Sequence, residues 1–152
     1  MGKLLEGKTA NYTSSVWSDV IDLISRISKK PYEGNETSMR IIADHIRTAV
    51  FISADEAGIK PSNKDQGYIL RRLIRRAIRH AKKLNIDINS SWMEELAITF
   101  IDDFKNYYKE LEDNKEVVLD GLKKEKIRFN RTLEKGLKEF AKVSDIGEKI
   151  TS

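Results

Sequence analysis

The feature that most limits the folds open to this chain of 152 residues is the stretch Leu70–Leu84, where apolar and basic residues recur with helical spacing. On a helical wheel of about 100° per residue, its apolar side chains fill less than half of the circle. The opposite arc holds Arg71, Arg72, Arg75, Arg76, Arg79, Lys82 and Lys83. The pattern therefore predicts a helix with one core face and one cationic face.

The rest of the chain has the same helical character. Alternation of period two is nearly absent, and proline occurs only at Pro31 and Pro61, both in loop-like contexts. These observations predict an all-α bundle of about five helices, with one long C-terminal helix. The expected helices are Ser14 or Ser15 to Lys29, Ser38 to Ala57 with Gly58 as a left-handed cap, Asn63 or Asp65 to Leu84, Trp92 to Tyr108 with Ser91 as cap, and Asn114 to Val143.

Size and composition restrict the function classes. Residues 1–152 match the length of a single domain, and we expect the tail Ser144–Ser152 to fray. With no cysteine, the chain has neither disulfides nor a thiolate metal site. The two histidines, His45 and His80, are too far apart in sequence for a metal site, so none is expected. No apolar run has the ~20 residues that cross a bilayer, and we expect a soluble cytoplasmic protein without a membrane partner.

Charge is distributed unevenly. The net charge is only +4, yet residues 66–86 contain seven Lys or Arg and no Asp or Glu. A solvated helix surface is the ordinary meaning of a charge run, but such helices usually carry acids four residues away to relieve repulsion. Arginine also binds phosphate oxygens in pairs and stacks on bases. We therefore favour a nucleic-acid partner for this face over a merely solvated surface.

Two blocks carry a family resemblance, SMRIIADHIRTAVF (Ser38–Phe51) and PSNKDQGYILRRLIRRAIRH (Pro61–His80). Both resemble alanyl-tRNA synthetases, which are class II aminoacyl-tRNA synthetases. Leu4–Tyr12 is similar to the family segment that follows the third class II motif, and Phe129–Leu137 is similar to the family's long helix. The resemblance identifies the chain as the helical tRNA-recognition segment that follows the catalytic domain.

The resemblance also implies what lies elsewhere. The motifs that bind ATP, magnesium and alanine would precede residue 1, and the editing domain with its zinc would follow residue 152. This segment by itself is thus expected to have no catalytic residue and no cofactor, although the parent alanine–tRNA ligase is an enzyme that attaches alanine to tRNA with ATP. We expect Met1 and Gly2 to derive from cloning, with a natural truncation as the alternative.

The implied partners are the acceptor stem of alanine-specific tRNA and the rest of the synthetase chain. The family reads a G·U wobble pair, whose guanine 2-amino group lies unpaired in the shallow minor groove of A-form RNA. The resemblance assigns an acceptor for that group to Asn63, with a second acceptor, an Asp, beyond Ser152. From its position alone, Asn63 would be expected to cap a helix, and only the resemblance favours base contact.

The remaining candidates for RNA contact are basic. The candidates for phosphate contacts are Arg71, Arg72, Arg75, Arg76 and Arg79, of which we expect only some to face one duplex, with Lys64 and Lys82 at the two ends of the surface. Gly67 is expected either to admit the RNA backbone or to adjust the first helical turn. Asp44 and Arg47 have the spacing of an ion pair, and we expect them and His45 to orient one helix against the basic one.

Two other functions remain open from the sequence. The basic helix would also suit a general helical protein that binds DNA or RNA. A structural bundle whose basic face meets an acidic protein surface is the third possibility. Neither requires the residues around Asp44 and Asn63, which is why we prefer tRNA recognition.

Overall fold

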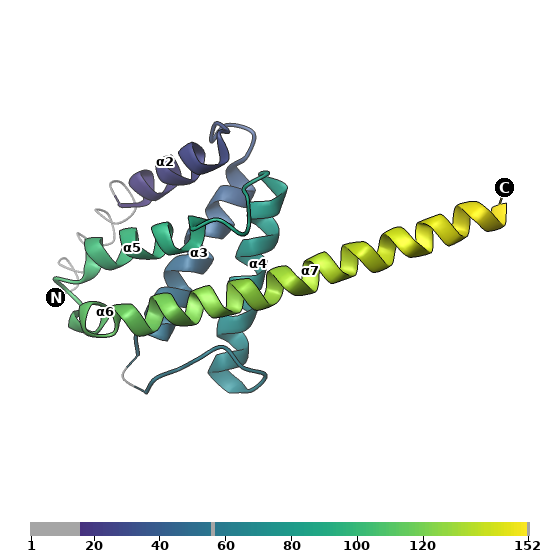
Figure 1. Cartoon of the computed structure of the whole chain (residues 1–152). Helices are drawn as coiled ribbons and strands as arrows, with labels where there is room; N and C mark the ends of the chain where they lie inside the picture. Colours follow the sequence, from purple (N-terminus) through teal and green to yellow (C-terminus); the bar gives the residue numbers. More distant parts are fainter. Residues whose placement is uncertain (1–15, 56, 152) are drawn as a thin grey trace.

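The computed structural model describes residues 16–55 and 57–151, with side chains as far as Ser144. Six helices and no strand occur in this part of the chain, so the predicted all-α fold with a long last helix is confirmed. The expected Ser14–Ser15 cap and the segment Leu4–Tyr12 lie outside the described residues. The helices are α2 (Trp17–Ser28), α3 (Glu36–Ser53), α4 (Asp65–Lys83), α5 (Trp92–Phe104), α6 (Lys109–Asp113) and α7 (Lys115–Thr151) (Figure 1).

The core lies around α3, which packs along α4 and also contacts α2, α5 and α7. Its apolar stripe includes Ile42 and Ile46, and these side chains are fully buried together with Ile74 and Ile78 of α4. The first half of α7 crosses the bundle, and its second half projects beyond it (Figure 1). None of the helices in the described ranges combines the length and apolarity needed to cross a membrane.

The basic helix forms where the sequence predicts it. α4 begins at Asp65 and ends at Lys83, and Asn85 follows in the left-handed conformation with φ 59°. The N–H of Asn85 donates to the Lys82 carbonyl at 3.0 Å, and that of Ile86 donates to the Ala81 carbonyl at 3.0 Å. These two hydrogen bonds form a Schellman motif, which satisfies carbonyl groups that would otherwise be unpaired at the C-terminus of the helix.

The boundaries of α3 differ from the prediction at both ends. The helix begins at Glu36, so Ser38 lies inside it and is not its cap. The hydroxyl of Ser38 instead lies 3.0 Å from Nδ1 of His80 on α4. α3 ends at Ser53, before Gly58, although Gly58 does have the predicted left-handed conformation with φ 69°.

The later helices also differ in extent. α5 ends at Phe104 instead of Tyr108, and the short helix α6 occupies the whole of the expected connection between Tyr108 and Asn114. Asn114 donates from Nδ2 to the Ala54 carbonyl at 2.9 Å, which ties the start of α7 to the end of α3. α7 is helical to Thr151, beyond the expected end at Val143, and the fraying of the tail stays a prediction.

Candidate nucleic-acid interface

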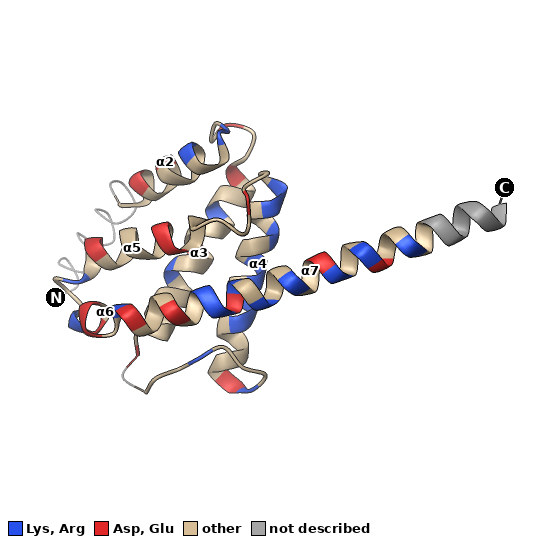
Figure 2. Cartoon of the chain, viewed as in Figure 1, with Lys and Arg blue, Asp and Glu red and all other residues tan. Residues whose placement is uncertain are grey.

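The cationic face of α4 is divided between exposed and buried arginines. Exposed cations lie along the whole helix: Arg72, Arg76, Arg79, Lys82 and Lys83. Arg75 is half-buried and Arg71 is buried, although both belong to the cationic arc of the helical wheel. Figure 2 shows basic residues along α4 and residues of both signs on α7 near the crossing, whereas acidic residues predominate on α5 and α6.

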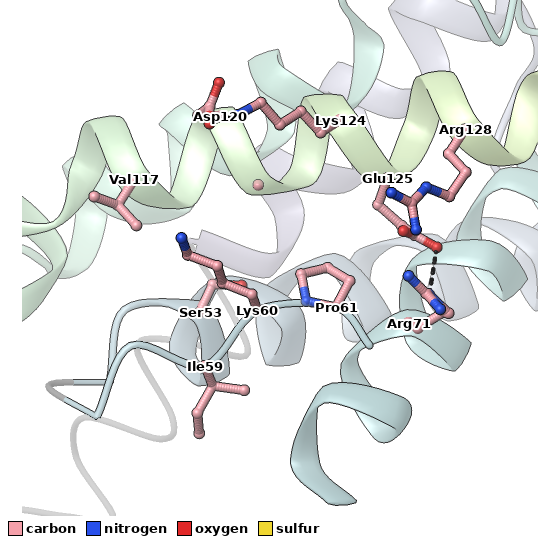
Figure 3. Close-up of a pocket in the computed structure, with 11 residues that line it drawn as sticks. Ser53, Ile59, Lys60, Pro61, Arg71, Val117, Asp120, Lys124, Glu125 and Arg128 are labelled. Carbon is pink, nitrogen blue, oxygen red and sulfur yellow. Dashed lines mark hydrogen bonds and ion pairs between the residues drawn. The ribbon is translucent and has the colours of Figure 1, made fainter. Parts of the chain in front are cut away.

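Arg71 is buried because α7 crosses α4 at this point and supplies a carboxylate. Nε of Arg71 donates to Oε1 of Glu125 at 3.0 Å, and the Glu125 side chain is only 3% exposed (Figure 3). A buried carboxylate is stable only when it is paired and hydrogen-bonded. Glu125 therefore provides the counter-charge for Arg71, because the only acidic residue of α4 itself is Asp65 in its first turn.

Arg75 shares the same carboxylate. Its Nε donates to Oε1 of Glu125 at 3.1 Å, and its guanidinium lies over the Phe129 ring at 5.0 Å from the centroid. Arg79 lies over the same ring at 5.4 Å. These contacts hold Arg75 and Arg79 against α7 while the side chains stay partly or fully accessible.

Asn63 lies at the surface just before α4, but it does not cap the helix. The N-cap position is occupied by Lys64, which is also exposed and makes no side-chain capping bond. Oδ1 of Asn63 instead accepts a hydrogen bond of 2.6 Å from Nη1 of Arg71. The capping alternative for Asn63 is therefore not what the structure shows, and its amide is linked to the Arg71–Glu125 pair.

Gly67 allows the loop before α4 to fold back onto the helix. The N–H of Ser62 donates to the Gly67 carbonyl at 3.0 Å. A Cβ atom at position 67 would lie 2.1 Å from Oγ of Ser62 and 2.5 Å from the Lys60 carbonyl oxygen. The space beside Gly67 is thus filled by the chain's own loop and not left open to an RNA backbone, and Asn63 of this loop lies beside Arg71.

A groove of about 510 Å³ runs along this surface. It is lined by His45, Asn63, Tyr68, Ile69, Arg71, Arg72, Leu73, Arg75, Arg76 and Arg79. Tyr68 and Ile69 are about half exposed, and Arg72 lies over the Tyr68 ring at 5.7 Å. The groove therefore offers cationic groups, an amide and apolar surface side by side, which suits phosphates, base edges and ribose.

On the α3 side of the groove, Asp44 and Arg47 form the predicted ion pair, with Nη2 and Oδ1 at 2.7 Å. His45 follows Asp44 in the chain, and its Nδ1 lies 3.4 Å from Oδ2 of Asp44 but not in hydrogen-bonding geometry. Burial lowers the pKa of His45, and the positive charge of Arg76 lowers it further, against the opposing effect of Asp44. The pKa of His80 is lowered for similar reasons, by burial and then by Lys83.

Two contributors to this surface were not predicted from the sequence. Glu125 lies in a segment that mixes both charges, where no spacing links it to α4. Tyr68 lies within the basic helix and carries no signal apart from its position. The role of Glu125 depends on the contact between α7 and α4, a tertiary feature that helical periodicity does not reveal. Tyr68 lies four residues before Arg72 on the same helix, so helical spacing is the signal that could have indicated its contact.

Comparison with known proteins identifies the family. The family model for tRNA synthetases class II (A) matches residues 1–150. The chain is similar to alanine–tRNA ligase of Borrelia hermsii, with 42% identity over 91% of this chain and 24% of the relative. Alanine–tRNA ligases of Treponema pallidum and Prochlorococcus marinus (strain AS9601) are each 35% identical, over 92% and 100% of this chain. The chain spans less than a quarter of the length of each of these three relatives.

Proposed function

Because the chain belongs to the tRNA synthetases class II (A), we propose that it is the part of an alanine–tRNA ligase that grips the acceptor stem of tRNA. The ATP-dependent attachment of alanine would then be carried out by the longer protein. In this proposal the groove along α4 receives the RNA, and the G·U wobble pair is recognised next to Asn63.

The observation that supports this proposal is the exposed row of arginines beside the groove. Arg72, Arg76 and Arg79 have no acidic partner within the described residues, although acids are plentiful on the other helices. Three cations spaced three or four residues apart repel one another on a helix. A phosphate backbone relieves that repulsion and releases counterions, so a polyanion is the partner that best fits this face.

Asn63 is the proposed base reader because it is exposed at one end of this row. Its amide can both donate and accept, which suits base edges in the shallow minor groove of A-form RNA. Oδ1 of an amide has two lone pairs, and one of them is used by Arg71. The second lone pair is available to the guanine 2-amino group, which is unpaired in a G·U wobble.

The other basic residues are proposed to bind the phosphate backbone of the RNA. Arg72, Arg76 and Arg79 would contact phosphates, and Arg75 would add its outer nitrogens while Nε stays with Glu125. Lys64 and Lys82 lie at opposite ends of α4, about 27 Å apart by helix rise. That span exceeds a single phosphate spacing, so these two lysines would contact different parts of the stem.

The proposal is tested by titrating the 152-residue chain with two RNA hairpins that differ only in a G·U or a G·C pair, and with a DNA duplex of equal length. We expect binding to both hairpins at moderate salt, tighter binding to G·U, and much weaker binding to DNA. Equal binding to RNA and DNA would favour a general nucleic-acid-binding function. Absence of binding to all three at near-physiological salt would contradict the proposal and favour an acidic protein partner.

A further inference from the structure

Glu125 of α7 links the buried side of α4 to the exposed amide of Asn63. We propose that Glu125 is a positioning residue, which holds Arg71 in place so that Arg71 fixes the side-chain amide of Asn63. The consequence for base reading rests on the proposed function of Asn63. The positioning itself is a property of the free chain and is tested without RNA.

The contacts form a chain from the interior to the surface. The buried Glu125 carboxylate accepts from Nε of Arg71 at 3.0 Å, and Nη1 of Arg71 donates to Oδ1 of Asn63 at 2.6 Å. The Arg71 side chain is 10% exposed, whereas Asn63 is exposed. Because the guanidinium is planar, two bonds through different nitrogens fix the direction of its whole plane.

The chemistry of arginine also fixes which end of the Asn63 amide faces inward. A guanidinium has donors and no acceptor, so the group that meets Nη1 must be the carbonyl oxygen of Asn63. If the amide were rotated by half a turn, two donors would face each other. The two hydrogens of Nδ2 and the second lone pair of Oδ1 therefore remain for a ligand.

Glu125 is required for this arrangement because a buried arginine without a carboxylate is costly. If the carboxylate were removed, Arg71 would be expected to turn toward solvent and to release the Asn63 amide. The loop itself would still be held by the backbone bond from Ser62 to Gly67. The predicted effect is thus specific to the amide and differs from loss of the loop.

The first test observes the Asn63 side-chain amide in ¹⁵N-labelled free chain by NMR, with Asn63→Asp used to assign its resonances. We expect Glu125→Gln to move these resonances, and Arg71→Lys to move them as well. The control is Glu94→Gln, which weakens a comparable link between α5 and α7, where Lys126 Nζ lies 2.8 Å from Glu94 Oε1 and the Lys126 side chain is 4% exposed. Asn63 resonances that stay in place in Glu125→Gln, or that move equally in the control, would overturn the proposal.

The second test measures the ratio of affinities for the G·U and G·C hairpins in a double-mutant cycle. We expect Glu125→Gln to lower this ratio, Asn63→Ala to lower it by about fivefold or more, and the double variant to lower it no further than Asn63→Ala. Independent, multiplicative losses would show that Glu125 does not act through Asn63. Equal binding of both hairpins by the unaltered chain would refute base reading by Asn63, while the amide resonances would still decide the positioning.

Discussion

At the scale of single residues, Arg71 differs from its neighbour Arg72 in burial, although the sequence gives both the same type and the same helical face. Arg71 pairs with Glu125 inside the structure, and Arg72 lies at the surface over Tyr68. Two arginines on one helix therefore have different roles. Arg71 stabilises the fold and orients Asn63, whereas Arg72 is available to a ligand.

This difference predicts unequal losses of stability. Arg71→Met leaves Glu125 with Arg75 as its remaining arginine, so we expect the free energy of unfolding to fall by about 1–3 kcal/mol. Arg72→Met removes an exposed side chain and is expected to change it by about 0.5 kcal/mol or less. Urea denaturation measures both values, and equal losses would contradict the burial of Arg71.

The two histidines predict a dependence of stability on pH. Burial lowers the pKa of His45 and of His80 from 6.5, so the unfolded chain binds more protons than the folded chain just below that pH. The free energy of unfolding should therefore fall as pH decreases from 7.5 to 5.5. We expect a smaller fall in the double variant His45→Gln/His80→Gln. An equal or larger fall in that variant would show that these histidines do not titrate as described.

At the scale of helices and loops, the segment before α4 depends on Gly67. Gly67→Ala would place a Cβ atom against Ser62 and the Lys60 carbonyl, so the loop must move and carry Asn63 with it. We expect a loss of about 1–3 kcal/mol in the free energy of unfolding, despite the better helix propensity of alanine. Weaker preference for the G·U hairpin should accompany this loss.

Gly136 of α7 provides the matched control for this prediction. It also lies inside a helix, but a Cβ atom there meets nothing within 4 Å. Gly136→Ala should therefore raise the free energy of unfolding by about 0.5–1 kcal/mol through helix propensity. If both substitutions raised the free energy of unfolding, this would contradict the close contact between the loop and Gly67.

The exposed face of α4 predicts a change in the salt dependence of RNA binding. The double variant Arg76→Ala/Arg79→Ala should weaken binding to both hairpins alike and lower the slope of log K against log salt by about 0.7–0.9 for each lost phosphate contact. Affinities measured between low and moderate salt give this slope. The control is Arg26→Ala on α2, an exposed arginine outside the groove. An unchanged slope in the double variant would place the RNA on another face.

At the scale of the whole molecule, local patterns predicted the helices better than the contacts between them. The spacing of apolar residues predicted α4 closely, and the Asp44–Arg47 pair follows from a single helical turn. The predicted start of α3 was wrong because serine is a residue type that often caps helices. In the structure the Ser38 hydroxyl instead contacts His80 on α4. A sequence pattern does not distinguish these two uses of serine.

At the candidate site, too, local sequence patterns did not predict the contacts between helices. The exposed cations and Asn63 were identified from periodicity and family resemblance, but the environment of Arg71 depends on where α7 crosses α4. Glu125 and Arg71 are 54 positions apart in sequence, and no local rule relates them. Long-range ion pairs of this kind become visible only when the helices are placed in space.

Charge is also distributed unevenly over the helices. Basic residues predominate on α4 and acidic residues on α5 and α6, whereas α2 and the crossing part of α7 carry both signs (Figure 2). Such an asymmetry orients a polyanion as it approaches, even when the net charge is only +4. RNA should therefore meet the α4 side of the bundle first.

The most direct test of this binding surface is an NMR titration of the ¹⁵N-labelled chain with the G·U hairpin, in which the backbone amide shifts are followed residue by residue. We predict that the largest changes occur at Asn63 and Lys64 and along Arg72–Arg79, with little change on α2 and α5. Changes concentrated on α2 or α5, with α4 unaffected, would contradict RNA binding in the groove of α4.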